Sequence, residues 1–113
     1  MNWIPLQSEA DLSQLIEKSK STPCIIFKHS TRCSISSIAK FRLEGDWDFD
    51  PEQVNIYYLD LINYRNLSHL VAETFSVTHE SPQLLLIKNG VCTYDSSHLD
   101  ITVDELKECL MDE

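Results

Sequence analysis

Glycine, proline, basic residues and long apolar runs are all scarce in this 113-residue chain. With only two glycines and four prolines, it does not have the composition of a disordered or linker-rich protein. No run approaches the roughly 20 apolar residues that a membrane span requires, so we expect no association with a membrane. The opening residues MNWIPLQSEA lack both the basic and the apolar segment of a signal peptide. We therefore expect a cytoplasmic protein.

The deficit of basic residues also limits the possible partners. Nine Lys and Arg stand against 18 Asp and Glu, which gives a formal net charge of −9 at pH 7. Such a charge repels the phosphate backbone of nucleic acids, so we expect no nucleic-acid partner. The length fits a single domain over residues 1–113, and we expect this domain to be a monomer.

Paired cysteines are also absent from the sequence. None of the four cysteines forms a CxxC motif, and none pairs with a histidine at the spacing of a zinc site, so we expect no metal. A cytoplasmic chain is not expected to hold a disulfide framework either. The cysteines therefore have to be considered one at a time: Cys24, Cys33, Cys92 and Cys109.

The hydrophobic pattern predicts an α/β domain. Apolar runs rich in β-branched residues predict strands, and apolar residues at helical spacing predict helices. The predicted strands are residues 2–6, 24–29, 54–61, 83–87 and 91–94, and the predicted helices are residues 9–20, 33–44, 63–75 and 103–110. Helical crossovers join the first three strands, so we expect them to be parallel, and Asn89-Gly90 predicts an antiparallel hairpin. The order β-α-β-α-β-α-β-β-α is that of a mixed sheet with helices on both faces.

The second predicted helix carries a more detailed expectation. Four apolar residues fall on one helical face, the pattern of a helix that packs against a core; they are Ile35, Ile38, Ala39 and Phe41. Gly45 follows and is expected to stop the helix.

Cys33 is the residue whose surroundings point to chemistry. It stands just after a predicted strand and at the start of a predicted helix, where unpaired N–H groups and the positive end of the helix dipole favour a thiolate. The thiolate is the attacking species in thiol–disulfide exchange. Arg32 adds a positive charge, and Ser36 adds a possible donor. The alternative is a small apolar residue packed at a helix end, but the polar STRCS loop favours the reactive role.

These features together resemble the thioredoxin fold: the order of elements, the cysteine at the start of the second helix, and Pro82 before the hairpin strand. In that family the proline is cis and faces the reactive cysteine. The resemblance therefore implies a cis Ser81-Pro82 bond close to Cys33. Thioredoxins usually carry a buried aspartate on the strand before the site, at the position of Phe27. Its absence fits a glutaredoxin-like or bacilliredoxin-like role better.

A closer resemblance, over nearly the whole chain, is to the monothiol bacilliredoxins, also called the YtxJ or BrxC family. The segments FKHSTRCSIS and SPQLLLIKNG carry it. The site pattern of that family maps onto Thr31, Cys33 and Ser36, and many members have proline where this chain has Ser34. The resemblance implies that Cys33 is the catalytic nucleophile. Ser36 would then occupy the place of a resolving cysteine in the catalytic site, which makes the mechanism monothiol.

The resemblance also implies the substrates. Bacillithiol is a small thiol of many Gram-positive bacteria, and bacilliredoxins remove it from proteins with which it forms mixed disulfides. Bacillithiol is then a co-substrate, the modified client proteins are the partners, and no other cofactor is needed. The residues that this resemblance places at the substrate are Thr31, Arg32, Ser34, Ser81 and Pro82.

Two details of the predicted site stay open at the level of sequence. Lys28, His29 and Arg32 gather positive charge that would attract the carboxylates of bacillithiol. Alternatively, Lys28 and His29 point away on alternate faces of their strand. Ser36, in turn, can donate its hydroxyl to the Cys33 thiolate, or it is a polar residue of the first helical turn that satisfies backbone groups; the two roles are compatible.

Two other functions also stay open: a glutaredoxin-like iron–sulfur carrier, although the chain lacks the Cys-Gly-Phe-Ser signature of such carriers, and a non-catalytic thioredoxin-like binding module. Cys24, at the start of its strand, is expected roughly 20 Å from Cys33. Cys92 follows the hairpin turn at the distant end of the sheet. We expect both, and Cys109, to be packing residues, although the sequence does not settle how far Cys109 lies from Cys33.

Overall fold

The computed structural model describes residues 1–111 and has the predicted order of elements with one short addition, the 3-10 helix η1. The elements are β1 (Trp3–Pro5), α1 (Glu9–Lys18), β2 (Cys24–His29), α2 (Ser34–Asp46), β3 (Asn55–Asp60), α3 (Arg65–Phe75), β4 (Gln83–Lys88), β5 (Val91–Ser97), η1 (His98–Asp100) and α4 (Val103–Met111). Within this described part, no helix is both long and apolar enough to cross a membrane.

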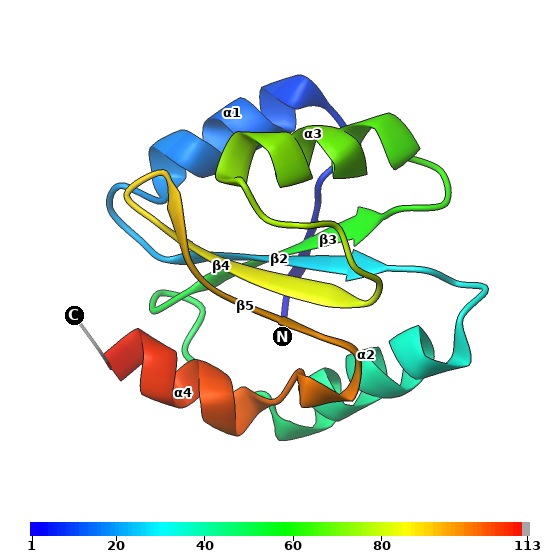
Figure 1. Ribbon diagram of the computed structural model, residues 1–113. Helices are drawn as coiled ribbons and strands as arrows, with labels where there is room; N and C mark the ends of the chain where they lie inside the picture. Colours follow the sequence, from blue (N-terminus) through cyan, green and yellow to red (C-terminus); the bar gives the residue numbers. More distant parts are fainter. Residues whose placement is uncertain (112–113) are drawn as a thin grey trace.

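The five strands form one mixed sheet in the order β1-β3-β2-β4-β5. The first three are parallel to one another, and β4 and β5 are antiparallel to their neighbours, which confirms the predicted arrangement. Helices α1 and α3 cover one face of the sheet, and α2 and α4 cover the other (Figure 1). The hairpin between β4 and β5 turns at Asn89 and Gly90, which both have the positive φ that such a turn requires.

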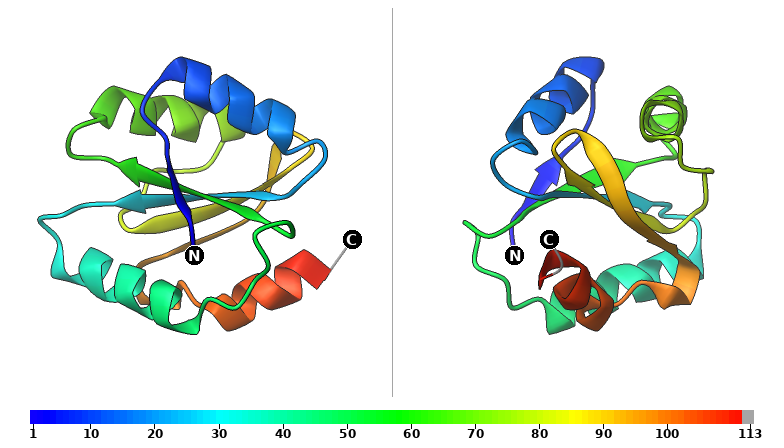
Figure 2. Two further views of the ribbon diagram at one scale, coloured as in Figure 1. Left: turned by 180° about the vertical axis from the view of Figure 1, so that it is seen from behind. Right: turned by 60° about the vertical axis from the view of Figure 1, so that its left-hand side comes forward.

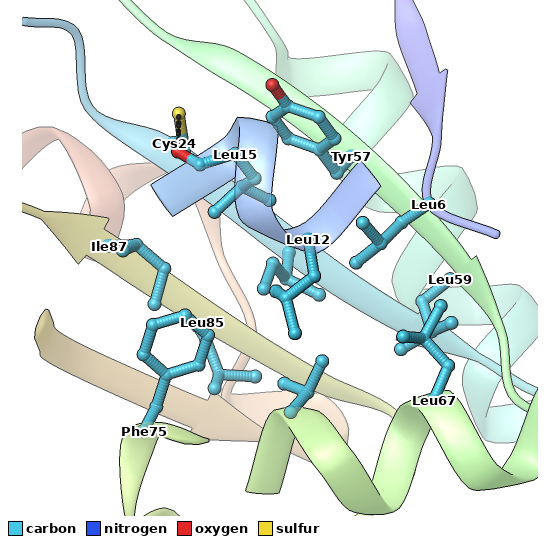
Figure 3. Packing of buried hydrophobic residues seen from close by; sticks show 12 residues of the cluster. Leu6, Leu12, Leu15, Cys24, Tyr57, Leu59, Leu67, Phe75, Leu85 and Ile87 are labelled. Atoms are coloured by element: carbon cyan, nitrogen blue, oxygen red, sulfur yellow. Dashed lines mark hydrogen bonds between the residues drawn. The ribbon is translucent and has the colours of Figure 1, made fainter. Parts of the chain in front are cut away.

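Each face of the sheet contributes to its own hydrophobic cluster. Cys24 and Ile26 of β2 join the cluster under α1 and α3, whereas the alternate residues Ile25 and Phe27 join the cluster over α2 and α4. Figure 3 shows side chains of α1, β4 and α3 converging in the first of these clusters. A strand that is covered on both faces in this way leaves none of its side chains in water, and all six residues of β2 are buried.

Helix α2 differs from its prediction in the face that it turns to the sheet. Its buried residues are Ser36, Ala39 and Leu43. Of the side chains predicted to face the core, only Ala39 does so, because Ile35, Ile38 and Phe41 are 40%, 49% and 76% exposed. Helical spacing shows which residues share a face, but the face that meets the sheet includes the polar Ser36, so the apolar pattern favoured the wrong face.

The ends of several elements also shift. Helix α2 continues through Gly45 and ends at Asp46, after which Trp47 packs edge-on against Phe49 with ring centroids 4.8 Å apart. Glycine inside a helix costs only about 1 kcal/mol, which packing can offset. Strand β5 runs on to Ser97, beyond the predicted end at Tyr94, and a register shift next to Leu86 interrupts its pairing with β4.

Candidate functional site

Cys33 is the N-cap residue of α2, as the sequence predicted. Its backbone N–H donates to Ser30 O at 3.2 Å, and its carbonyl accepts from the Ser37 N–H at 3.2 Å, so the chain turns directly from β2 into the helix. The Cys33 side chain is half-buried and makes no capping hydrogen bond, and the first turn of α2 contains no acidic residue. Cys33 therefore lies at the positive end of the dipole of a 13-residue helix whose first turn carries no carboxylate.

Ser36 ties the first turn of α2 to the end of β2. Its side chain is fully buried, and Oγ accepts from the Ser30 N–H at 3.0 Å and lies 2.6 Å from His29 Nδ1. Of the two roles that the sequence left open, the structure thus shows the one in which the hydroxyl satisfies a backbone N–H. Its hydrogen bond with the Cys33 thiolate stays a prediction.

The loop between α3 and β4 brings Pro82 to the same end of the sheet. The Ser81-Pro82 peptide bond is cis, as the resemblance to thioredoxins implied. Because β2 and β4 are antiparallel with Lys28 opposite Gln83, the residues just before β4 lie beside the end of β2 that leads to Cys33. Figures 1 and 2 show this end of the sheet from the front and from behind, with the β2–α2 and β3–α3 connections on the same side.

The predicted substrate-binding residues divide into two groups. Thr31, Arg32 and Ser34 are exposed and flank Cys33 in sequence. Ser81 is half-buried and Pro82 is buried. Within residues 1–111, Ser81 Oγ is one of two buried side-chain oxygens for which the structure shows no hydrogen-bond partner. The exposed residues that flank Cys33 in sequence are therefore small polar side chains and one cation.

Comparison with known proteins agrees with this geometry. The family model of the monothiol bacilliredoxin BrxC matches residues 4–106. The chain belongs to this family. Its structure is similar to that of a proposed oxidoreductase with a thioredoxin fold, with a TM-score of 0.78 and 32% sequence identity over 94% of this chain and 91% of the other.

More distant neighbours show the same fold. The thioredoxin of Malassezia sympodialis has a TM-score of 0.76 and 15% identity over 96% of this chain and 88% of the other. The thioredoxin of Fasciola hepatica has a TM-score of 0.71 and 20% identity over 95% of each chain. The chain thus has a thioredoxin fold, and family and fold together identify a thiol redox protein.

His29 lies on the α2 side of the sheet and contributes no exposed charge. Its ring packs between Phe27, with centroids 5.9 Å apart, and Tyr58, with centroids 5.6 Å apart. Burial, and next the charge of Lys40, lower the pKa of His29 below its ordinary value. The ring is therefore neutral at neutral pH, and it links Ser36 to the aromatic packing of the core.

Lys28 points to the opposite face and is fully buried. Its Nζ donates to Ser68 O of α3 and to Nδ1 of His79, each at 3.1 Å. The alternate-face alternative is thus confirmed, and Arg32 is left as the exposed cation beside Cys33. Sequence reasoning missed the burial of Lys28, and the signal that could have revealed it is its place in a strand that is apolar on both faces.

The other three cysteines lie away from this site. Cys24 is opposite Ile87, and Ile87 is opposite Cys92, so both cysteines lie at the end of the sheet remote from Cys33. Burial raises the pKa of the thiols of Cys24 and Cys92, which keeps them protonated. Cys109 is half-buried on α4, and its carbonyl accepts from Lys88 Nζ at 3.1 Å.

Proposed function

We propose that this protein removes bacillithiol from protein mixed disulfides, with Cys33 as the nucleophile. The observation that carries the proposal is the position of Cys33 as the N-cap of α2, half-buried and flanked by exposed residues, in a chain of the monothiol bacilliredoxin family. A partly exposed sulfur at the start of a helix is within reach of a disulfide on another protein and can attack it as the nucleophile.

The proposed reaction exchanges one disulfide for another. The Cys33 thiolate attacks the bacillithiol sulfur of the mixed disulfide, and a new bond forms between these two sulfur atoms. The old disulfide bond breaks, and the client cysteine leaves as a thiolate that takes a proton from water. No net oxidation occurs in this step. Cys33 is left bound to bacillithiol, and a second thiol from solution must attack that disulfide to regenerate the protein.

Ser36 explains why the second thiol must come from outside. It occupies the position that holds the resolving cysteine in a dithiol site, and a hydroxyl cannot form a disulfide. Its buried hydrogen bonds with Ser30 and His29 instead hold the first turn of α2 against the sheet. Ser36 therefore positions Cys33 while leaving it the one reactive sulfur of the site.

The exposed residues beside Cys33 have the chemistry to bind bacillithiol. Arg32 presents a guanidinium that matches the carboxylates of bacillithiol, and Thr31 and Ser34 offer hydroxyl groups. Ser81 and Pro82 border the site from the neighbouring loop. In this proposal bacillithiol is a co-substrate and the modified client proteins are the macromolecular partners.

The test is a comparison of cysteine variants by intact mass. The native protein, Cys33→Ser and Cys92→Ser are each incubated with a test protein that carries bacillithiol on its single cysteine. We expect the native protein and Cys92→Ser to gain one bacillithiol and to release the test protein as a free thiol. Cys33→Ser should do neither. Full activity of Cys33→Ser would overturn the assignment, as would a native protein that gains no adduct.

A further inference from the structure

A lysine is buried in the middle of the fold where no step of the proposed reaction uses it. Lys28 has 0% of its surface exposed, on the face of β2 that is turned away from α2 and Cys33. Among the ion pairs within residues 1–111, none involves Lys28. The partners shown for its ammonium group are Ser68 O and His79 Nδ1.

Such a position is unfavourable for the lysine itself. Removing an ammonium group from water without a carboxylate to pair with it opposes folding. The same burial lowers the pKa of Lys28 from 10.5 to about 8, so the side chain still carries a proton at neutral pH. Leucine or methionine would fill this space without that cost. The lysine is therefore best explained by what its ammonium group holds in place.

The group that it holds belongs to the loop of Pro82. His79 stands in the segment between α3 and β4, and its Nδ1 also lies 3.3 Å from Ser68 Oγ. Gln83, directly opposite Lys28 across the sheet, holds the same loop. Its Nε2 donates to Thr78 O at 2.9 Å, and its Oε1 accepts from the Glu80 N–H at 3.4 Å.

We propose that Lys28 is a positioning residue for the exchange reaction, which holds the loop at residues 78–82 through His79 so that Ser81 and Pro82 face the disulfide formed at Cys33. The inference rests on the proposed function and deepens it. Lys28 and Gln83 are neighbouring buried side chains that reach the loop at consecutive residues. Together they hold the loop from the face of the sheet that α3 covers, while Ser36 holds the start of α2 from the opposite face of β2.

The contact requires a neutral histidine. A lysine ammonium has only donors, so Nδ1 of His79 must accept, and the remaining proton of the ring is on Nε2. The groups that act on His79 are Lys28 from β2, His69 from α3 and Glu80 from its own loop. Burial, then Lys28 and His69, lower the pKa of His79, and Glu80 raises it. The contact therefore persists through neutral pH and is lost in acid, when two cations would face each other.

The first experiment removes the ammonium group. Lys28→Met is compared with Lys88→Met, a matched variant at the opposite end of the sheet whose lysine donates to a carbonyl of α4. Two rates are measured for each: exchange with the bacillithiol-modified test protein, and alkylation of Cys33 by iodoacetamide. The small reagent reports the reactivity of the sulfur without needing the loop. We expect Lys28→Met to lose about tenfold in exchange with alkylation unchanged, as for the loss of one buried hydrogen bond to a charged group. Lys88→Met should leave both rates unchanged.

The second experiment replaces His79 with a residue that does not titrate but can still accept the hydrogen bond from Lys28. The amide oxygen of Asn occupies nearly the place of Nδ1 of His, so His79→Asn can still accept from Lys28. In the native protein we expect the ratio of the exchange rate to the alkylation rate to fall when the pH is lowered far enough to protonate His79. In His79→Asn the ratio should stay constant. His79→Leu removes the acceptor at a half-exposed position and should lose as much exchange activity as Lys28→Met. If Lys28→Met does not fold, His79→Leu takes its place in the test.

The outcomes separate the two proposals. If the native protein forms no adduct at Cys33, the proposed function fails. If it does, and Lys28→Met or His79→Leu keeps the native ratio of exchange to alkylation, then Lys28 is only a core residue and the positioning role is overturned. A pH dependence of His79→Asn equal to that of the native protein would also overturn it.

Discussion

The two faces of β2 each bury a basic side chain against a helix, yet they do so by different chemistry. On the α2 face, His29 is a neutral ring between two aromatic rings and bonds to Ser36. On the α3 face, Lys28 is a cation that bonds to Ser68 O and His79. Burying His29 costs little free energy because the ring is uncharged and its Nδ1 is hydrogen-bonded, whereas burying Lys28 leaves a charge in the core.

This difference shows how one central strand can serve both halves of a site. Consecutive residues of a strand point to opposite faces, so His29 reaches the helix that begins at Cys33 and Lys28 reaches the loop that carries Pro82. The backbone of β2 thus connects the sulfur and the proline loop through two adjacent side chains. Four predictions test this comparison.

The largest effect is expected from the aromatic packing on the α2 face. Phe27→Ala removes a fully buried ring that stacks on His29 and lies 5.7 Å from Trp3, centroid to centroid. We expect the free energy of unfolding to fall by about 3 to 5 kcal/mol, because a large cavity opens beside the imidazole. Urea denaturation measures it. A loss below about 1 kcal/mol would show that the α2 face does not depend on this stack.

The next largest effect is the pH dependence of the free energy of unfolding that arises from Lys28, on the α3 face. The pKa of Lys28 is about 8 in the folded protein and has its ordinary value of 10.5 in the unfolded chain. Between these values the unfolded chain binds a proton that the folded protein has released, so the contribution of Lys28 to stability rises with pH. We expect the stability of the native protein relative to Lys28→Met to increase by about 2 kcal/mol from pH 7 to pH 10. Urea denaturation of both proteins at the two pH values measures this, and a constant difference would contradict it.

A smaller loss is expected at the contact between β2 and α2. Ser36→Ala leaves the buried Ser30 N–H without an acceptor and His29 Nδ1 without its partner. We expect a destabilisation of about 1 to 2 kcal/mol. Ser37→Ala, at an exposed position one residue later, is the matched control and should change stability by less than about 0.5 kcal/mol. Equal effects of the two variants in urea denaturation would contradict the role of the Ser36 hydrogen bonds.

The smallest effect is expected on the outer face of α2. Phe41 is 76% exposed, so Phe41→Ser should change the free energy of unfolding by no more than about 0.5 kcal/mol. Leu43→Ala, on the buried face of the same helix, should cost about 2 to 5 kcal/mol. Chemical denaturation of the two variants decides which stripe of α2 meets the sheet, and the reverse order would favour the face predicted from sequence.

Much of the fold was predictable because it depends on local patterns. Apolar runs and helical spacing predicted the order of elements, and the crossovers predicted which strands are parallel, as the structure confirms. The start of α2 at Cys33 followed from the change from strand to helix spacing. The hairpin at Asn89 and Gly90 followed from turn chemistry. Each of these features is decided by residues near one another in the chain.

The sequence by itself therefore determined the thioredoxin fold and the place of Cys33 at a helix N-terminus. Only the tertiary structure decided that Ile38 and Phe41 face outward, that Ser36 bonds to His29, and that Lys28 bonds to Ser68 and His79. The physical reason is that a periodic pattern shows which side chains share a face, whereas burial depends on which distant segments pack against that face. For Lys28 those segments are α3 and the loop of His79, and no pattern within β2 reveals them.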